Sequence, residues 1–151
     1  MSCSRTMDRR HTGQQRGFSL LELMVVLAII AIVALIALPD FRSTLDASRT
    51  TSAANNLLGA FKLARSEAVL RRASVTVCPS SDQSTCSGSW SDGGVVRTNA
   101  GVVIRTIPAA GGVTIAGAAI SFNGDGTSAG GSVTVDTRTV TVNPIGHSKV
   151  E

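Results

Sequence analysis

The chain has 151 residues, enough for one folded domain, and a formal net charge of +4. Four arginines and one aspartate precede residue 18, so the rest of the chain is close to neutral. A cationic surface covering the whole protein is therefore not indicated, and the few aromatic residues, none of them tyrosine, argue against a stacking platform for single-stranded nucleic acid.

Residues 18–38 form an apolar run in which Ser19 and Glu22 are the only polar residues. A helix of this length covers about 31 Å, close to the roughly 30 Å hydrocarbon core of a bilayer. The run is longer than the apolar part of a secretory signal peptide, and it ends in Pro39 and Asp40 rather than at a small-residue cleavage site. Because the arginines precede the run, the positive-inside rule places its amino end in the cytoplasm and the body of the protein outside.

The junction RGFSLLE, residues 16–22, resembles the signal of type IV pilins and pseudopilins. In those proteins a prepilin peptidase cuts after the glycine and methylates the new terminal amine, and a glutamate is the fifth residue after the cut. The resemblance implies that residues 1–17 are a cleaved cytoplasmic leader, that Gly17 and Phe18 flank the cut, and that prepilin peptidase is a partner.

Glu22 lies about 6 Å into the apolar run, counted from Phe18 along a helix. A carboxylate at this depth is unfavourable without a partner, and charge inside a bilayer normally marks function. The pilin resemblance implies a partner, the terminal amine of a neighbouring subunit, and thus an assembly role for Glu22. The alternative is that the side chain extends to the cytoplasmic headgroups.

Helical patterning continues beyond the apolar run, through a segment of residues 39–72 that we expect to be the periplasmic half of the helix. Its apolar residues recur at three- and four-residue spacing, which predicts that one face packs on a sheet. We expect a bend near residues 35–39, because Pro39 lacks a backbone donor and disturbs the preceding turn. The apolar stripe consists of Ala54, Leu57, Leu58, Phe61, Ala64 and Ala68.

Residues 73–151 have the composition of a β-rich head. Short runs of Val, Ile and Thr alternate with Gly, Ser, Asn and Asp, a pattern that predicts strands joined by turns. A helix followed by strands predicts an α+β fold, with the long helix packed on a small antiparallel sheet, as in pilins. Strands are expected at residues 74–78, 94–98, 102–107, 113–116, 119–122, 132–136 and 139–142.

Removal of the leader, with Cys3, leaves Cys78 and Cys86 as a pair. Their spacing allows a disulfide across a short loop, which suits an oxidising periplasm. Two reduced thiols in a cytosolic protein would conflict with the membrane segment, and a zinc site with His147 would lack an obvious fourth ligand. No catalytic constellation is visible, and the glycine-rich turns lack the lysine of a phosphate loop, so we predict no enzyme activity, metal or cofactor.

The body resembles the GspH/FimT family of minor pilins and pseudopilins. The resembling features are, in order, ARSEAV at 64–69, Cys78-Pro79, Cys86, WSDGG at 90–94, FNGDG at 122–126 and Gly146. The resemblance implies a structural subunit that joins other minor and major pilins, in the tip or priming complex of a type IV pilus or a type II secretion pseudopilus. The chain would be a single-pass protein of the inner membrane with a periplasmic head.

The carboxyl-terminal tail raises an alternative function. Some FimT-like pilins carry a Gly-Arg-x-Arg element that is implicated in DNA binding during natural transformation, and His147 and Lys149 follow Gly146 at the two arginine positions. Histidine is mostly neutral at pH 7, and lysine lacks the bidentate fork that suits phosphate. The alternative to DNA contact is a plain mobile tail. The arginines of residues 65–72 would add positive charge only if the tail folds back near them.

Overall fold

The computed structural model describes residues 17–35 and 41–151 in full and gives the backbone alone for residues 36–40. The chain divides into two units, residues 1–40 and 41–151, which are described separately. One helix, α1 (Leu20–Arg71), contributes to both. The predicted leader, up to residue 16, lies outside the described residues, as does the side chain of Pro39, so the bend stays a prediction.

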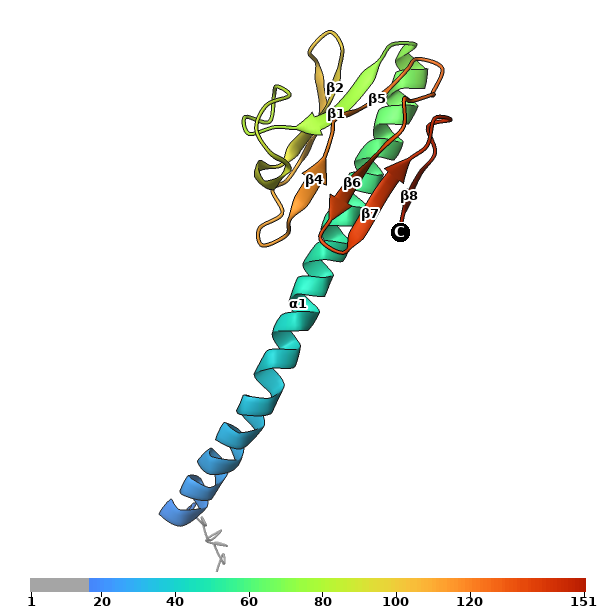
Figure 1. Cartoon of the computed structure of the whole chain (residues 1–151). Helices are drawn as coiled ribbons and strands as arrows, with labels where there is room; N and C mark the ends of the chain where they lie inside the picture. The colour runs from blue at the N-terminus through green and yellow to red at the C-terminus, as the bar shows by residue number, and fades with distance from the viewer. Residues whose placement is uncertain (1–16) are drawn as a thin grey trace, which may run out of the picture. The chain divides into compact units, whose positions relative to one another are not determined.

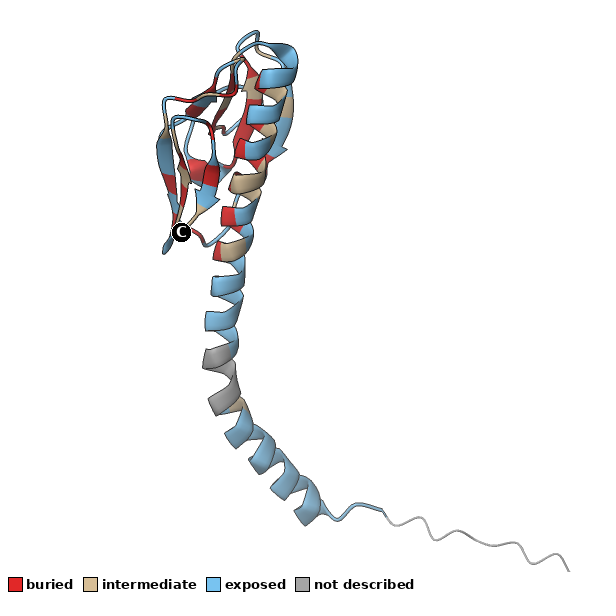
Figure 2. Ribbon diagram, turned by 90° about the vertical axis from the view of Figure 1, so that its right-hand side faces the viewer, coloured by how far each residue is buried: buried red, intermediate tan, exposed pale blue. Residues whose placement is uncertain are grey.

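In the second unit, α1 buries one face and exposes the other (Figure 2). Most of the buried residues are alanines, which let the strands approach the helix closely, and Phe61 is the largest side chain on this face. The predicted stripe is confirmed, except that Leu58 is half-buried, and two further alanines extend it. The buried residues of the helix are Thr50, Ala53, Ala54, Leu57, Ala60, Phe61, Ala64 and Ala68.

The head contains two antiparallel four-stranded sheets rather than one (Figure 1). Their strand orders are β3-β2-β1-β5 and β4-β6-β7-β8. Seven strands fall where the sequence predicts them, while β8 lies in the segment predicted to be a mobile tail. The strands are β1 (Val75–Pro79), β2 (Gly94–Thr98), β3 (Val103–Ile107), β4 (Ile115–Gly117), β5 (Ile120–Phe122), β6 (Gly131–Val135), β7 (Arg138–Val142) and β8 (Ser148–Val150).

The core of the head lies between α1 and valines from both sheets. Phe61 of the helix and Phe122 of β5 are fully buried, with ring centroids 6.4 Å apart. The indole N–H of Trp90, in a short 3-10 helix at Trp90–Asp92, donates to the carbonyl oxygen of Gly117 at 3.0 Å. This bond ties the loop before β2 to β4, so it connects the two sheets.

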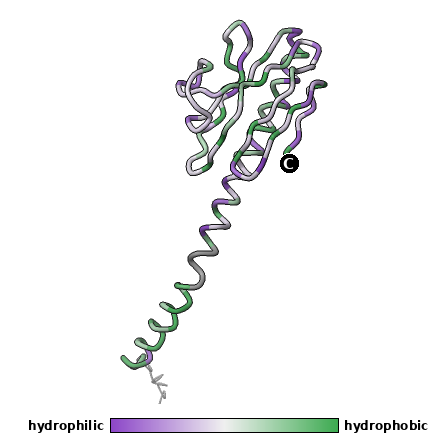
Figure 3. Tube along the Cα trace, in the orientation of Figure 1, coloured by the Kyte–Doolittle hydropathy of each residue, from purple (hydrophilic) through white to green (hydrophobic). Residues whose placement is uncertain are grey.

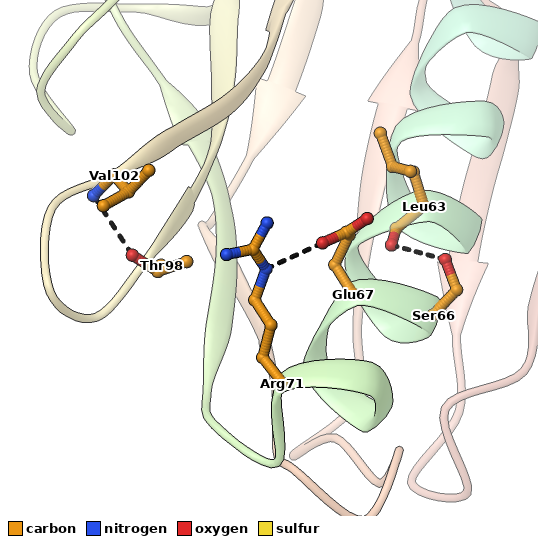
Figure 4. Close-up of polar contacts among 6 residues, drawn as sticks. All are labelled: Leu63, Ser66, Glu67, Arg71, Thr98 and Val102. Carbon is orange, nitrogen blue, oxygen red and sulfur yellow. Dashed lines mark hydrogen bonds and ion pairs between the residues drawn. The ribbon is translucent and has the colours of Figure 1, made fainter.

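The end of α1 sets where the sheets begin. The amide of Ala73 donates to the Ala68 carbonyl and the amide of Arg72 to the Val69 carbonyl, the two bonds of a Schellman motif. Arg72 takes the left-handed conformation (φ 52°) that glycine usually occupies there. Arg71, the last helical residue, pairs with Glu67 one turn earlier at 2.7 Å, as Figure 4 shows beside the turn that joins β2 and β3.

Candidate functional site

The amino-terminal part of α1 presents an apolar surface with one acid. Gly17 and Phe18 precede the helix, the Phe18 side chain is 81% exposed, and Glu22 lies in the first helical turn. A carboxylate at this end is favoured by the helix dipole, an effect that the sequence pattern alone does not reveal. Within this unit, the predicted cleavage site and the predicted assembly residue are thus separated by one turn.

Apolar side chains surround this part of the helix on every side. Figure 3 shows it as the most hydrophobic segment of the fold. A helix that is apolar all round is normally buried, and a monomeric soluble protein rarely leaves so large a patch uncovered. The large exposed side chains are Phe18, Leu20, Leu21, Leu23, Met24, Val25, Val26, Leu27, Ile29, Ile30, Ile32, Val33 and Leu35.

No helix among the described residues contains a stretch long and apolar enough to cross a membrane. The span that the sequence predicts, residues 18–38, extends past residue 35 into the part whose side chains are not described. Membrane insertion therefore stays a prediction at this point.

In the head, Cys78 and Cys86 form a disulfide, with Cα atoms 5.5 Å apart. Cys78 is fully buried on β1, whereas Cys86 is exposed on the loop after it. Asp82 organises this loop by accepting bonds from the Thr85 amide and hydroxyl, the Ser84 amide and the Ser80 hydroxyl. These bonds, led by the Thr85 amide, hold the Asp82 pKa far below its usual range, so the carboxylate that orders the loop stays ionised in acid as well as at neutral pH.

The carboxyl-terminal segment is ordered, contrary to the predicted mobile tail. Ser148–Val150 pairs with β7, and the His147 amide donates to the Asn143 side chain at 2.8 Å. Lys149 forms an ion pair with Glu151, so its charge is partly compensated. The pairing with β7 supplies the backbone partners that a mobile tail would find in water.

Arg65 holds this segment against α1. Its Nε donates to the Gly126 carbonyl at 3.1 Å, and its Nη2 donates to the Ile145 carbonyl at 3.0 Å. Gly146 needs to be glycine, because its φ is +76° and a Cβ atom would lie 2.0 Å from the Gly126 oxygen. The helix and the two loops therefore meet without room for a larger residue.

An open groove of about 550 Å³ runs between α1 and the β7–β8 turn. It gathers Lys62 and Arg65 with His147, so the tail folds back beside Arg65, one of the arginines of residues 65–72. Lys62 and Arg65 have no carboxylate at ion-pair distance among residues 17–35 and 41–151. The other lining residues are Ser66, Val69, Leu70, Gly146 and Ser148.

No group of three or more His, Cys, Asp or Glu residues within the described part could hold a metal. Asp125, the acid in the glycine turn, binds the amide and hydroxyl of Thr127 at 2.9 and 2.7 Å. The hydroxyl bond, and then the amide bond, lower the Asp125 pKa. These contacts explain Asp125 as a turn residue.

Comparison with known protein families identifies the family of this chain. A family model described as type II transport protein GspH matches residues 53–146, more than half of the chain. The chain belongs to the GspH family. A second model, the prokaryotic N-terminal methylation motif, matches residues 13–38 of this GspH-family chain. No curated protein sequence matches the chain significantly.

The solved structures confirm the pilin-like fold. The type IV minor pilin FimU of Pseudomonas aeruginosa strain PAO1 matches in a P21 crystal form with a TM-score of 0.53 and 18% identity, over 69% of this chain and 89% of FimU. A P65 form of the same protein gives a TM-score of 0.52 and 19% identity, over 67% and 91%. The resemblance to the GspH/FimT family is therefore confirmed.

Sequence reasoning missed two residues of this GspH-family chain. Lys62 is not among the residues singled out from the sequence, and the fold makes it a wall of the groove. Arg65 was expected only to add charge if the tail folded back near it, and it also anchors two loops. A signal for the second role was the pair of glycines at 126 and 146, since close approach of backbone to a helix side chain often requires glycine.

Proposed function

We propose that this chain is a minor pilin or pseudopilin that enters the tip or priming complex of a type IV pilus or a type II secretion pseudopilus, and that it works by assembly rather than catalysis. The observation that supports this most is the uniformly apolar start of α1 with Glu22 in its first turn, directly after Gly17 and Phe18. Family membership and the methylation motif support the same role.

The proposed sequence of events follows from where this apolar surface is stable. The precursor inserts in the inner membrane with its leader in the cytoplasm and its head in the periplasm, where the disulfide is stable. Prepilin peptidase cuts after Gly17 and methylates Phe18. In the filament, apolar helices of neighbouring pilins replace lipid around α1, and Glu22 pairs with the terminal amine of another subunit.

Intact-mass analysis of the chain extracted from the envelope of cells with the matching peptidase tests this proposal. The expected product begins at Phe18 and carries one methyl group. In a Gly17→Val variant only the precursor should be found. A Cβ atom at position 17 meets nothing within 4 Å, so the block would reflect recognition by the peptidase rather than misfolding.

Gly13→Val, a change of another leader glycine, is the matched control and should be processed normally. A wild-type chain that keeps its leader in such cells, or that is cut elsewhere, contradicts the proposal.

DNA contact is a second candidate function, favoured by the groove that brings together Lys62, Arg65 and His147. The ion pair with Glu151 weakens the contribution that Lys149 of the tail would make to DNA binding. Phosphate binding depends steeply on salt, because cationic side chains release counterions from DNA. The groove cations would contact the backbone and carry no sequence preference.

Titration of labelled duplex DNA with the full chain in nanodiscs, at several salt concentrations, tests this second role. Lys62→Ala is expected to weaken binding and to reduce the salt slope by about one, since each phosphate contact contributes roughly 0.9. Arg138→Ala is the matched control, because Arg138 is exposed at the other end of β7. Binding that is absent, insensitive to salt or equally affected by both variants rules out the groove as a DNA site.

A further inference from the structure

The disulfide of the head lies on the outer face of the sheet β3-β2-β1-β5. Val75 and Val77 of β1 belong to the hydrophobic core, and side chains alternate along a strand, so Cys78 points away from that core. Cys78 is nevertheless fully buried. The loop after β1 folds over this face, since Cys86 of the loop is bonded to Cys78.

The two cysteines differ in access from solvent. Cys86 is exposed and lines an open groove of about 230 Å³ together with Arg97, whereas Cys78 has no exposed surface. A thiolate that breaks a disulfide must reach one of its two sulfur atoms, and the rate depends on which sulfur is accessible. In the folded head, Cys86 offers that access and Cys78 does not.

The same difference decides which cysteine reacts first in the reduced chain. A thiol that is buried in apolar surroundings keeps its proton and is inert, whereas a neighbouring cation favours the reactive thiolate. The Cys78 sulfur lies 4.0 Å from the Val95 carbonyl oxygen, an acceptor for its proton inside the sheet. Cys86 shares its groove with the guanidinium of Arg97. Cys86 is therefore the nucleophile of the pair.

Hydrogen bonds hold the two cysteines together independently of the S–S bond. The amide of Ser87, next to Cys86, donates to the carbonyl of Pro79, next to Cys78, at 3.1 Å. Asp82 orders the loop between them through four further bonds. None of these bonds involves a sulfur atom, so reduction leaves them in place and the effective concentration of one thiol beside the other stays high.

We propose that a thiol–disulfide oxidoreductase of the Cys-x-x-Cys class acts on the folded head at Cys86, and that Cys78 completes the exchange. The Cys86 thiolate attacks the enzyme's disulfide, and one enzyme sulfur leaves and takes up a proton. Cys78 then attacks the Cys86 sulfur of the mixed disulfide and passes its proton to the second enzyme sulfur as it departs. The chain loses two electrons and two protons, which the enzyme gains as a dithiol.

Single-cysteine variants test the order of attack. The full chain in nanodiscs, with Cys3→Ser, is reduced and exposed to glutathione disulfide, and intact mass follows the addition of glutathione. Cys78→Ala should react at least about tenfold faster than Cys86→Ala, because burial excludes the reagent from Cys78. In urea the two rates should agree within about twofold. Equal rates in the folded chain, or a difference that persists in urea, overturn the assignment.

The Cys3→Ser chain with both head cysteines gives a second measurement that needs neither alanine variant. The chain is reduced, treated briefly with N-ethylmaleimide in native buffer, and digested for peptide mapping. Cys86 should be labelled before Cys78. Labelling of Cys78 first, or of both cysteines at the same rate, overturns the proposed order.

Asp82 is a positioning residue in this proposal. Asp82→Ala releases the loop, so the ratio of disulfide to dithiol in a glutathione redox buffer should fall at least about tenfold. Asp125→Ala is the matched control, because Asp125 orders another turn through the Thr127 amide and hydroxyl, and it should change the ratio less than about twofold. Equal ratios for the two variants, with both folded by circular dichroism, overturn the role of Asp82.

The partner is tested in cells that express the Cys78→Ala chain with Cys3→Ser. After acid quenching and alkylation, a reducible adduct to a protein with a Cys-x-x-Cys motif supports the oxidoreductase, and Cys86→Ala should abolish it. An adduct to a protein without the motif, or no adduct, overturns this partner. The periplasmic location of the enzyme rests on the proposed function. Failure of leader cleavage would contradict that function and leave the glutathione rates unchanged, so the two failures are distinguishable.

Discussion

Glu22→Gln is expected to reduce incorporation of the chain into a filament by at least about tenfold, while cleavage after Gly17 proceeds normally. The carboxylate lies in the first turn of α1, within its apolar amino-terminal part. In apolar surroundings a subunit amine left without its counter-charge is costly, because little solvent screens it. Filaments sheared from cells, quantified by immunoblot against the membrane fraction, measure the change.

Two further variants distinguish the effect of the charge at position 22 from the effect of losing an acid elsewhere in the helix. Glu22→Asp keeps the charge and should recover part of the incorporation. Asp46→Asn removes an acid from the same helix that forms an exposed pair with Arg49 at 3.2 Å, a type of contact worth little, and should leave incorporation unchanged. Incorporation of the Glu22→Gln variant at the wild-type level would show that Glu22 has no role in assembly. The alternative, in which its side chain reaches the headgroups, would then hold.

Phe61→Ala is expected to lower the free energy of unfolding of the head by about 3–5 kcal/mol, the range for truncation of a buried aromatic side chain. Phe61 is fully buried where α1 meets the sheets, and its ring packs near Phe122. Truncation leaves a cavity that the surrounding alanines of the helix are too small to fill. Denaturant titration followed by the fluorescence of Trp90, the single tryptophan and a buried one, measures the loss.

Lys62→Ala, at the next position of the helix, is the matched control. Lys62 is exposed, so its removal should change stability by less than about 0.5 kcal/mol. A loss below about 1 kcal/mol for Phe61→Ala would contradict the central position of this ring in the core.

Local patterns predicted much of the fold. The spacing of Leu57, Phe61 and Ala68 identified the buried face of α1 because helical period alone decides which residues share a face. The end of the helix was predicted within one residue, since composition changes sharply there. Seven strands were found from β-branched runs between turn residues.

The missed features depend on contacts between distant residues. Ser148–Val150 is too short to show alternation, and it becomes a strand because β7 offers it a paired edge. The division into two sheets follows from the pairing of β1 with β5, about 45 residues later, which no local pattern reports. The two hydrogen bonds from Arg65 to loops 61 and 80 residues away likewise depend on the fold.

The packing of α1 has a mechanical consequence for the second unit. Its buried face between Thr50 and Ala68 extends over five turns, and Arg65 and Thr50 add hydrogen bonds to Gly126, Ile145 and Asp136. A force applied along the helix would shear all of these contacts at the same time instead of peeling them one by one. Tension would then reach the head through its core, and the helix would leave the sheets only when the whole domain yields.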